Sequence, residues 1–235
     1  MRPMPRTAER LPGKGRTRAA RVRLTREAII EAALAEIDGK GLEGLSMRGL
    51  GAVLGVEAMA LYHHFPSKDR LLDGIMERLL AEAELPAPGS MPPLERLRHF
   101  VRSYRQIAAR HPHAFALLAV RRFNTEAAFA LYERILEALA EAGFDDIQSG
   151  RLFRLIGSYA SGAALAEIAS RAPETDSAAV KLDSFADRQR FPRVAAVVRY
   201  LRVDNLEAVF EFGLDVILDA IRRQAGAGRR RDEVG

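Results

Sequence analysis

The chain has 235 residues, of which 48% are hydrophobic, and it contains no cysteine. This length allows one large domain or two small ones with a substantial core. The absence of cysteine excludes disulfides, thiol chemistry and cysteine-ligated metal sites. No apolar run approaches the roughly 20 residues that cross a membrane, and the basic N-terminus lacks the apolar core of an export signal. We therefore expect a cytoplasmic protein without a membrane segment.

The positive charge is concentrated at the N-terminus. Residues 1–23 hold eight Lys or Arg and one Glu, a net charge of +7, so the formal charge of +5 leaves 5 − 7 = −2 for the remaining residues. This segment is rich in Arg, Pro and Gly and cannot bury enough apolar surface to fold alone, so we expect a disordered basic arm. Such an arm can lie along the minor groove of DNA and neutralise phosphate charge. A solvated tail without that role is the alternative.

A first helix is expected directly after this arm. Thr25 is a suitable N-cap, and the apolar residues Ile30, Leu34 and Ile37 follow at the spacing of one helix face. Two glycines, at positions 39 and 41, are expected to end this helix.

The following residues have the pattern of two short helices joined by a tight turn. Ser46 can cap the first of them, and Gly55 supplies the turn. A second short helix is expected over residues 57–63, with Leu61 facing inward and the other side chains free to face a partner. We expect Gly51 to permit close contact between the two helices. This is the layout of a helix-turn-helix, whose second helix enters the major groove of DNA.

Residues 24–75 resemble the TetR family of bacterial regulators, most specifically in the Leu-Tyr-x-His-Phe-x-x-Lys run over residues 61–68. The resemblance implies DNA contacts by the helix N-termini, the recognition helix and the start of the fourth helix, namely by Thr25, Ser46, Arg48, Ala58, Met59, Ala60, Tyr62, His63, His64 and Lys68. Tyr62, His64 and Lys68 match positions that contact phosphate. The alternative for Tyr62 and His64 is interior packing with the polar tip outward.

The recognition helix departs from the more polar pattern of the family. By the resemblance, Arg48 matches a position that reaches a base or its phosphate, and a bidentate contact to guanine is its best chemistry. The side chains of residues 58–60 (Ala-Met-Ala) can only touch thymine methyls or exclude mismatched shapes. Glu57 can accept a hydrogen bond from a cytosine amine, but the favoured interpretation is that it stabilises the helix start. His63 is the best additional candidate to contact a base. We therefore expect Arg48 and DNA shape to carry much of the discrimination.

Further helices are expected after the DNA-binding segment. Ser67 is expected to cap a fourth helix, over residues 68–84, and residues 85–93 contain four prolines that mark a boundary. Helical patterns then cover residues 93–110, 112–121, 125–142, 146–171, 192–201 and 205–224, while residues 172–189 are expected to form a polar loop. No segment shows sustained period-two alternation. We therefore expect an all-α fold with four parts: a basic arm (1–23), a three-helix helix-turn-helix DNA-binding domain (24–70), a helical ligand-binding and dimerisation domain (71–225) and a disordered tail (226–235).

The last helix is apolar on two faces. One stripe contains Leu206, Val209, Phe210, Gly213, Ile217 and Ile221, and further apolar residues are Phe212, Val216 and Ala220. A helix that is apolar on two faces must be buried on two faces. The resemblance implies that the last two long helices pair with those of a second subunit as a four-helix bundle. A monomer that covers both faces internally is the alternative.

The resemblance also implies that the second domain binds a small-molecule effector and that the fourth helix transmits its presence. Candidate aromatic pocket residues are Phe100, Tyr104, Phe115, Phe123, Phe153 and Tyr159, and candidate polar ones are Arg122, Ser158 and Glu167. The alternative for each is an ordinary core or surface position. The effector itself cannot be named from the sequence.

No metal, cofactor or enzyme site is expected. His111 and His113 flank a proline, and we interpret them as exposed imidazoles at a helix break, because no carboxylate or cysteine stands at a matching spacing. The sequence has no glycine-rich phosphate loop, nucleophile elbow or His-Glu-x-x-His motif. We expect a ligand-responsive regulator, most simply a repressor, that binds a near-palindromic double-stranded operator as a homodimer and is released by a small molecule. A structural protein that coats DNA without an effector is the alternative; it would explain the arm but not the large apolar second half.

Overall fold

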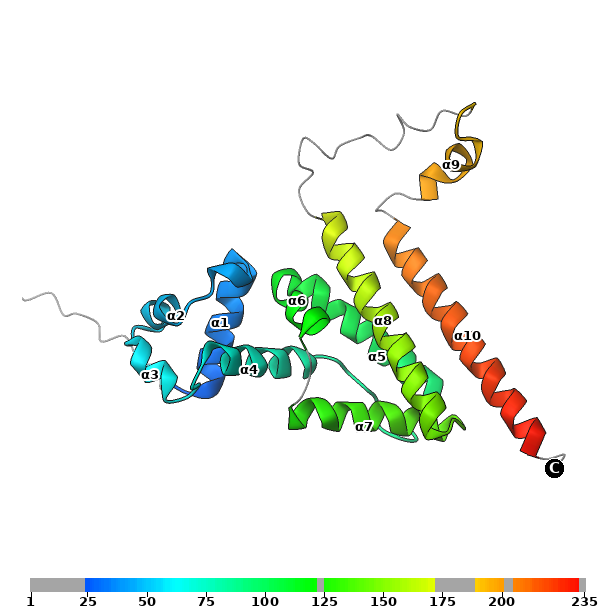
Figure 1. Cartoon of the computed structure of the whole chain (residues 1–235), viewed down its shortest axis with the longest axis horizontal. Helices are drawn as coiled ribbons and strands as arrows, with labels where there is room; N and C mark the ends of the chain where they lie inside the picture. Colours follow the sequence, from blue (N-terminus) through cyan, green and yellow to red (C-terminus); the bar gives the residue numbers. More distant parts are fainter. Residues whose placement is uncertain (1–23, 122–124, 172–188, 201–204, 233–235) are drawn as a thin grey trace, which may run out of the picture.

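The computed structural model describes residues 24–121, 125–171, 189–200 and 205–232, and within these ranges every regular element is a helix (Figure 1). In chain order the elements are α1 (Arg26–Lys40), η1 (Leu42–Gly44), α2 (Met47–Leu54), α3 (Ala58–Tyr62), α4 (Lys68–Leu80), α5 (Pro93–Arg110), α6 (Pro112–Val120), α7 (Glu126–Glu141), α8 (Asp146–Arg171), α9 (Pro192–Val197), η3 (Val198–Tyr200) and α10 (Leu206–Asp232). The expected basic arm, and nearly all of the expected polar loop, lie outside the described residues.

Helices α1 to α3 form a small unit at one end of the molecule (Figure 1). The Thr25 hydroxyl accepts a hydrogen bond from the Ala28 amide at 3.1 Å, which confirms Thr25 as the N-cap of α1. The buried face of α1 is wider than predicted, because Ile29 and Ala33 are fully buried together with Leu34 and Ile37. The predicted inward residue Ile30 is only half-buried. The reason is that α1 packs against both α2 and α4, so more than one stripe is covered.

Helix α4 connects the small unit to the rest of the chain (Figure 1). It packs against α1 on one side and against α6 and α7 on the other, so its buried residues surround most of the helix: Leu71, Leu72, Gly74, Ile75, Met76, Leu79 and Leu80. The helix begins at the predicted cap Ser67, whose hydroxyl accepts from the Arg70 amide at 3.2 Å. It ends at Leu80 and not near residue 84, because the chain turns there and the Glu84 amide donates to Ser103 of α5 at 2.8 Å.

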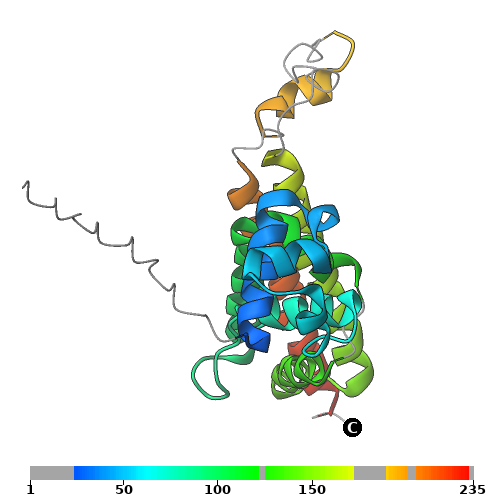
Figure 2. The same ribbon diagram turned by 90° about the vertical axis from the view of Figure 1, so that its left-hand side faces the viewer.

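The second domain is built around α5, which packs against α6, α7, α8 and α10. The observed bounds of α5 to α8 agree with the predicted ranges to within one residue at each end. Helices α8 and α10 are long and lie side by side along the edge of the domain (Figure 1). In the view turned by 90° about the vertical axis, α1 to α4 lie in front of this domain (Figure 2). No helix among the described residues combines the length and apolarity needed to cross a membrane.

Helix α10 differs from its prediction in register and in length. The residues buried against α5 and α8 are Phe210, Leu214, Leu218 and Ile221. Val209, predicted to belong to the inward stripe, is 54% exposed, since it lies on the outer face of the helix. The helix continues to Asp232, whereas the sequence predicted an end at Gln224 and a disordered tail from residue 226.

Candidate nucleic-acid interface and effector region

The turn between α2 and α3 depends on two glycines. Gly55 has φ +68°, a left-handed conformation that side chains rarely adopt. At Gly51 an added Cβ would lie 2.8 Å from the backbone oxygen of Val56 and 3.2 Å from the amide nitrogen of Ala58. The expectation that Gly51 permits close helix contact is therefore confirmed, because any side chain there would push α3 away from α2.

Helix α3 directs most of its side chains away from the domain core. Leu61 and the following Phe65 are fully buried and hold the helix in place. Met59 is 70% exposed and Tyr62 is 40% exposed. His63 is exposed, and Ala58, Ala60 and His64 are half-buried. Glu57 stands at the N-cap of α3 without a capping hydrogen bond from its side chain. The outward side of α3 thus carries one large apolar side chain, Met59, followed by the polar Tyr62 and His63.

Three of the candidate DNA-contacting residues come together at the start of α2. Ser46 caps α2 by accepting from the Gly49 amide at 3.0 Å, and Arg48 is exposed in the first turn. Lys68 lies beside them, because its Nζ donates to the backbone oxygen of Leu45 at 2.6 Å. A phosphate at this end of α2 would meet free backbone amides, a hydroxyl and two cations.

The start of α1 is less favourable for a phosphate. Glu27 lies in the first turn, and hydrogen bonds from its own backbone amide and from Thr25 lower the pKa of its carboxyl group. The carboxylate is therefore charged and repels a second anion at this helix end. Of the two capped helix ends that the sequence nominated, the end at Ser46 is the better site for phosphate.

Arg26 is a structural residue of this surface that the sequence did not reveal. Its Nη1 donates to the backbone oxygen of His64, and its guanidinium lies 4.1 Å from the centre of the Phe65 ring. These contacts tie the chain after α3 to the start of α1. The two partners stand 38 and 39 positions away in sequence, so no local pattern could have indicated them.

The predicted effector residues fall into two separate places. Phe100, Tyr104 and Phe115 are buried together, with ring centres 6.0 Å apart for the first pair and 5.4 Å apart for the second. Phe153 packs edge-on against Tyr132 at 4.9 Å. Burial raises the pKa of Tyr132 to about 12.

Ser158 and Tyr159 lie elsewhere, in a hollow of about 470 Å³ between α8 and α10. Tyr159 stacks on Phe210 at 5.9 Å and donates its hydroxyl hydrogen to the Phe210 backbone oxygen at 2.6 Å. Glu167 lines the same hollow and accepts from Nε of Arg105 at 2.7 Å. Arg122 and Phe123, the remaining two candidates, lie outside the described residues.

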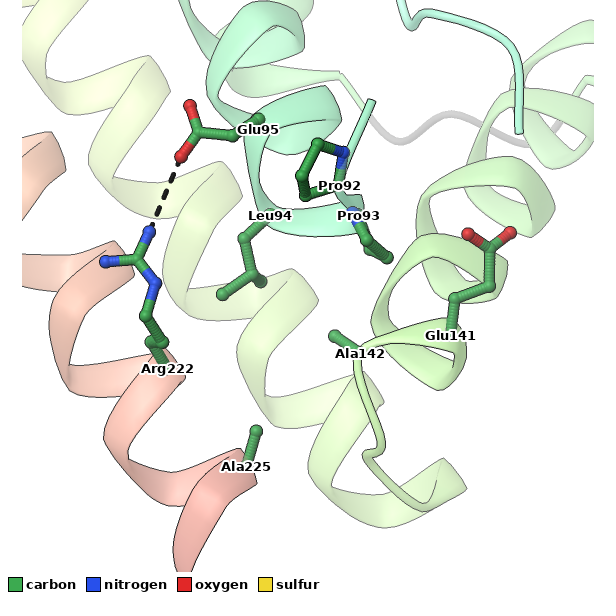
Figure 3. Close-up of a pocket in the computed structure, with 8 residues that line it drawn as sticks. All are labelled: Pro92, Pro93, Leu94, Glu95, Glu141, Ala142, Arg222 and Ala225. Atoms are coloured by element: carbon green, nitrogen blue, oxygen red, sulfur yellow. Dashed lines mark hydrogen bonds and ion pairs between the residues drawn. The ribbon is translucent and has the colours of Figure 1, made fainter. Parts of the chain in front are cut away.

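A second hollow, of about 450 Å³, lies where the start of α5, the end of α7 and the C-terminal part of α10 meet (Figure 3). Arg222 points toward Glu95 across it, with 3.4 Å between the charged groups. Glu141 lines the opposite side and pairs at 2.7 Å with Arg96, whose side chain is fully buried. The sequence did not predict this hollow.

The prediction of exposed imidazoles at the α5–α6 junction is wrong for His111. Its Nδ1 lies 2.6 Å from a carboxylate oxygen of Asp38, and its Nε2 lies 3.3 Å from one of Glu82, so its side chain is only 18% exposed. His113 pairs with the backbone oxygen of Asp38 at 2.9 Å. These contacts join α1 to the second domain. Because the contacting residues are far apart in the sequence, no local sequence pattern could have predicted them. No group of three or more potential metal ligands occurs in the part of the chain that the structure describes.

Together these features define a two-domain DNA-binding regulator with a helix-turn-helix. A family model described as "Bacterial regulatory proteins, tetR family" matches residues 29–75, and one described as "Tetracyclin repressor-like, C-terminal domain" matches residues 85–225. The chain belongs to the TetR family of transcriptional regulators. Members of this family are regulators and not enzymes, which agrees with the expectation from the sequence.

Individual relatives resemble the chain over most of its length. The HTH-type transcriptional repressor DrrR1 of Streptomyces coeruleorubidus is 30% identical, over 92% of this chain and 84% of the relative. The class D tetracycline repressor of Escherichia coli is 27% identical, over 87% of this chain and 92% of the relative. The crystal structure of ActR of Streptomyces coelicolor in complex with actinorhodin superposes with a TM-score of 0.74 at 26% identity, covering 87% of this chain and 99% of ActR.

Proposed function

We propose that this protein is a repressor that binds a near-palindromic operator as a homodimer and leaves it when a small molecule occupies the second domain. The observation that carries the proposal is the outward-facing α3, held by buried Leu61 and Phe65, next to the cluster of Ser46, Arg48 and Lys68. A DNA-binding regulator acts where the chromosome is, so the proposal places the protein in the cytoplasm.

The unpaired outer face of α10 supports the homodimer. Val209, Phe212 and Val216 are 54%, 71% and 51% exposed, and they follow one another at helical spacing. Leu155 and Leu165 of the neighbouring α8 are 48% and 38% exposed. A second copy that brings the same two helices would cover this apolar strip by a twofold contact. The two recognition helices would then enter the major groove at successive turns on one face of the DNA.

The aromatic residues inside the second domain support an effector. Phe100, Tyr104 and Phe115 pack together on α5 and α6. Tyr132 and Phe153 pack together on α7 and α8, and both of these helices contact α5. ActR, which shares this fold, is in complex with actinorhodin. A ligand in this region needs to favour the DNA-incompetent arrangement by only a few kcal/mol to release the operator. Helix α4 contacts both α1 and this region, so it is the element through which we expect the change to pass.

Footprinting on the DNA that flanks the protein's own gene tests the proposal. The expected result is protection of one short, near-palindromic site, weakened at least tenfold by Arg48→Ala because a guanidinium contact to DNA is lost. Lys40→Ala is the matched control, since Lys40 is an exposed cation at the opposite end of α1 from Thr25. Equal protection of any duplex would favour the DNA-coating alternative, and no protection would contradict both.

A further inference from the structure

The recognition surface of this chain has an unusual chemistry for DNA. Within α3, the sequence Ala-Met-Ala-Leu-Tyr places one polar side chain, Tyr62, among five residues. Met59 is among the most exposed large apolar side chains of the described residues, at 70%. Leu61 and Phe65 fix the orientation of α3 from inside, so Met59 does not serve the domain core.

We propose that α3 selects thymine methyl groups in the operator, with Met59 as the residue that contacts them. This inference rests on the proposed function and names the chemistry that the recognition helix selects. The thymine 5-methyl is the one apolar group that unmodified bases display in the major groove. An exposed thioether flanked by two alanines offers the other base edges no hydrogen-bond donor and only a weak acceptor, but it can bury that methyl.

The charges around α3 strengthen this assignment. Residues 24–70 contain five Lys or Arg and seven Asp or Glu, so this domain attracts DNA weakly for its size. Glu57 stands at the start of α3 and adds negative charge there. The cations placed to meet phosphate, Arg48 and Lys68, lie at the start of α2 and not along α3. The exposed Met59 can therefore add to affinity only through apolar burial, beside the polar contacts open to Tyr62.

Selection followed by removal of single methyl groups tests the inference. The full-length protein is used to enrich duplexes from a randomised pool, and each thymine of the enriched sequence is then replaced by deoxyuridine, which lacks only the methyl. We expect a symmetric pair of positions at which one replacement lowers affinity about fourfold, and both together about 16-fold, since each buried methyl contributes about 0.8 kcal/mol. Changing the same T·A pair to 5-methylcytosine·G should restore part of the affinity that unmethylated C·G loses.

Variants assign the effect to the side chain. With Met59→Ala or Met59→Gln, deoxyuridine at the sensitive positions should change affinity by less than about 1.5-fold, because the apolar partner of the methyl is absent. Met91→Ala, which alters an exposed methionine outside the DNA-binding domain, should keep the full sensitivity. Enrichment of a duplex that tolerates deoxyuridine at every thymine would overturn the inference while leaving the proposed function intact. If the Met59 variants remain as sensitive as the parent, the inference is likewise overturned. Failure to enrich any duplex would refute the proposed function itself.

Discussion

Replacing His111 with alanine tests how the DNA-binding domain is joined to the second domain. His111 stands at the junction of α5 and α6, and its Nδ1 lies 2.6 Å from Asp38 near the end of α1. Its Nε2 lies 3.3 Å from Glu82, just after α4. We expect the two carboxylates to respond differently to the loss of the imidazole, because only one of them has other partners.

The magnitudes follow from those partners. Glu82 keeps Arg78 at 2.7 Å and Arg110 at 3.1 Å after the substitution, so its coupling to His111 should be clearly smaller than that of Asp38. Asp38 has no other side-chain partner among the described residues, and its Oδ1 is already buried without one. A hydrogen bond to a charged group contributes roughly 1.5–3 kcal/mol. Since the Asp38 side chain is 26% exposed and recovers some water, we expect a coupling of about 1–2 kcal/mol.

Double-mutant cycles measure both couplings. The free energy of unfolding is determined by urea denaturation, at one fixed protein concentration, for alanine variants of His111 and Asp38 singly and together. The same cycle with Glu82 in place of Asp38 is the matched comparison. A coupling to Glu82 as large as that to Asp38, or none to Asp38, would refute the reasoning that His111 serves mainly to satisfy the end of α1.

Three further outcomes are expected. Phe212→Ala should raise the dimer dissociation constant by about 10³, because about 2 kcal/mol of apolar burial is lost from each of two symmetric copies. Analytical ultracentrifugation measures this constant. The control Phe129→Ala, which alters a phenylalanine 58% exposed on α7, should leave the dissociation constant unchanged. Deletion of residues 1–23 removes a net charge of +7 and should weaken operator binding several-fold and flatten its salt dependence. If a DNA titration shows that operator affinity depends on salt concentration as before, the arm has no such role. Burial raises the pKa of Tyr132 to about 12 from an unfolded value of about 10. The free energy of unfolding that the protonated phenol contributes is therefore fully present below pH 10 and is lost as the pH rises toward 12. Tyr132→Phe should remove that part of the alkaline loss, about 1 kcal/mol after allowance for solvent screening, and an identical pH profile for parent and variant in denaturation experiments would rule the effect out.

The sequence by itself determined where most helices begin and end. Thr25, Ser46 and Ser67 accept hydrogen bonds from amides three residues later, a contact that depends only on local chain geometry. Gly55 takes a positive φ for the same local reason. The helix-turn-helix could be predicted because its caps, turn and apolar spacing all fall within about twenty consecutive residues.

Only the tertiary structure decided which faces of the helices are buried and which side chains meet. Leu214 and Leu218, which the predicted stripe of α10 left out, lie in the core because α5 and α8 approach the helix from that side. Tyr159 bonds to Phe210 across 51 residues, and His111 bonds to Asp38 across 73. Apolar periodicity indicates that a face is buried but not what covers it, because the covering helix comes from a distant part of the chain.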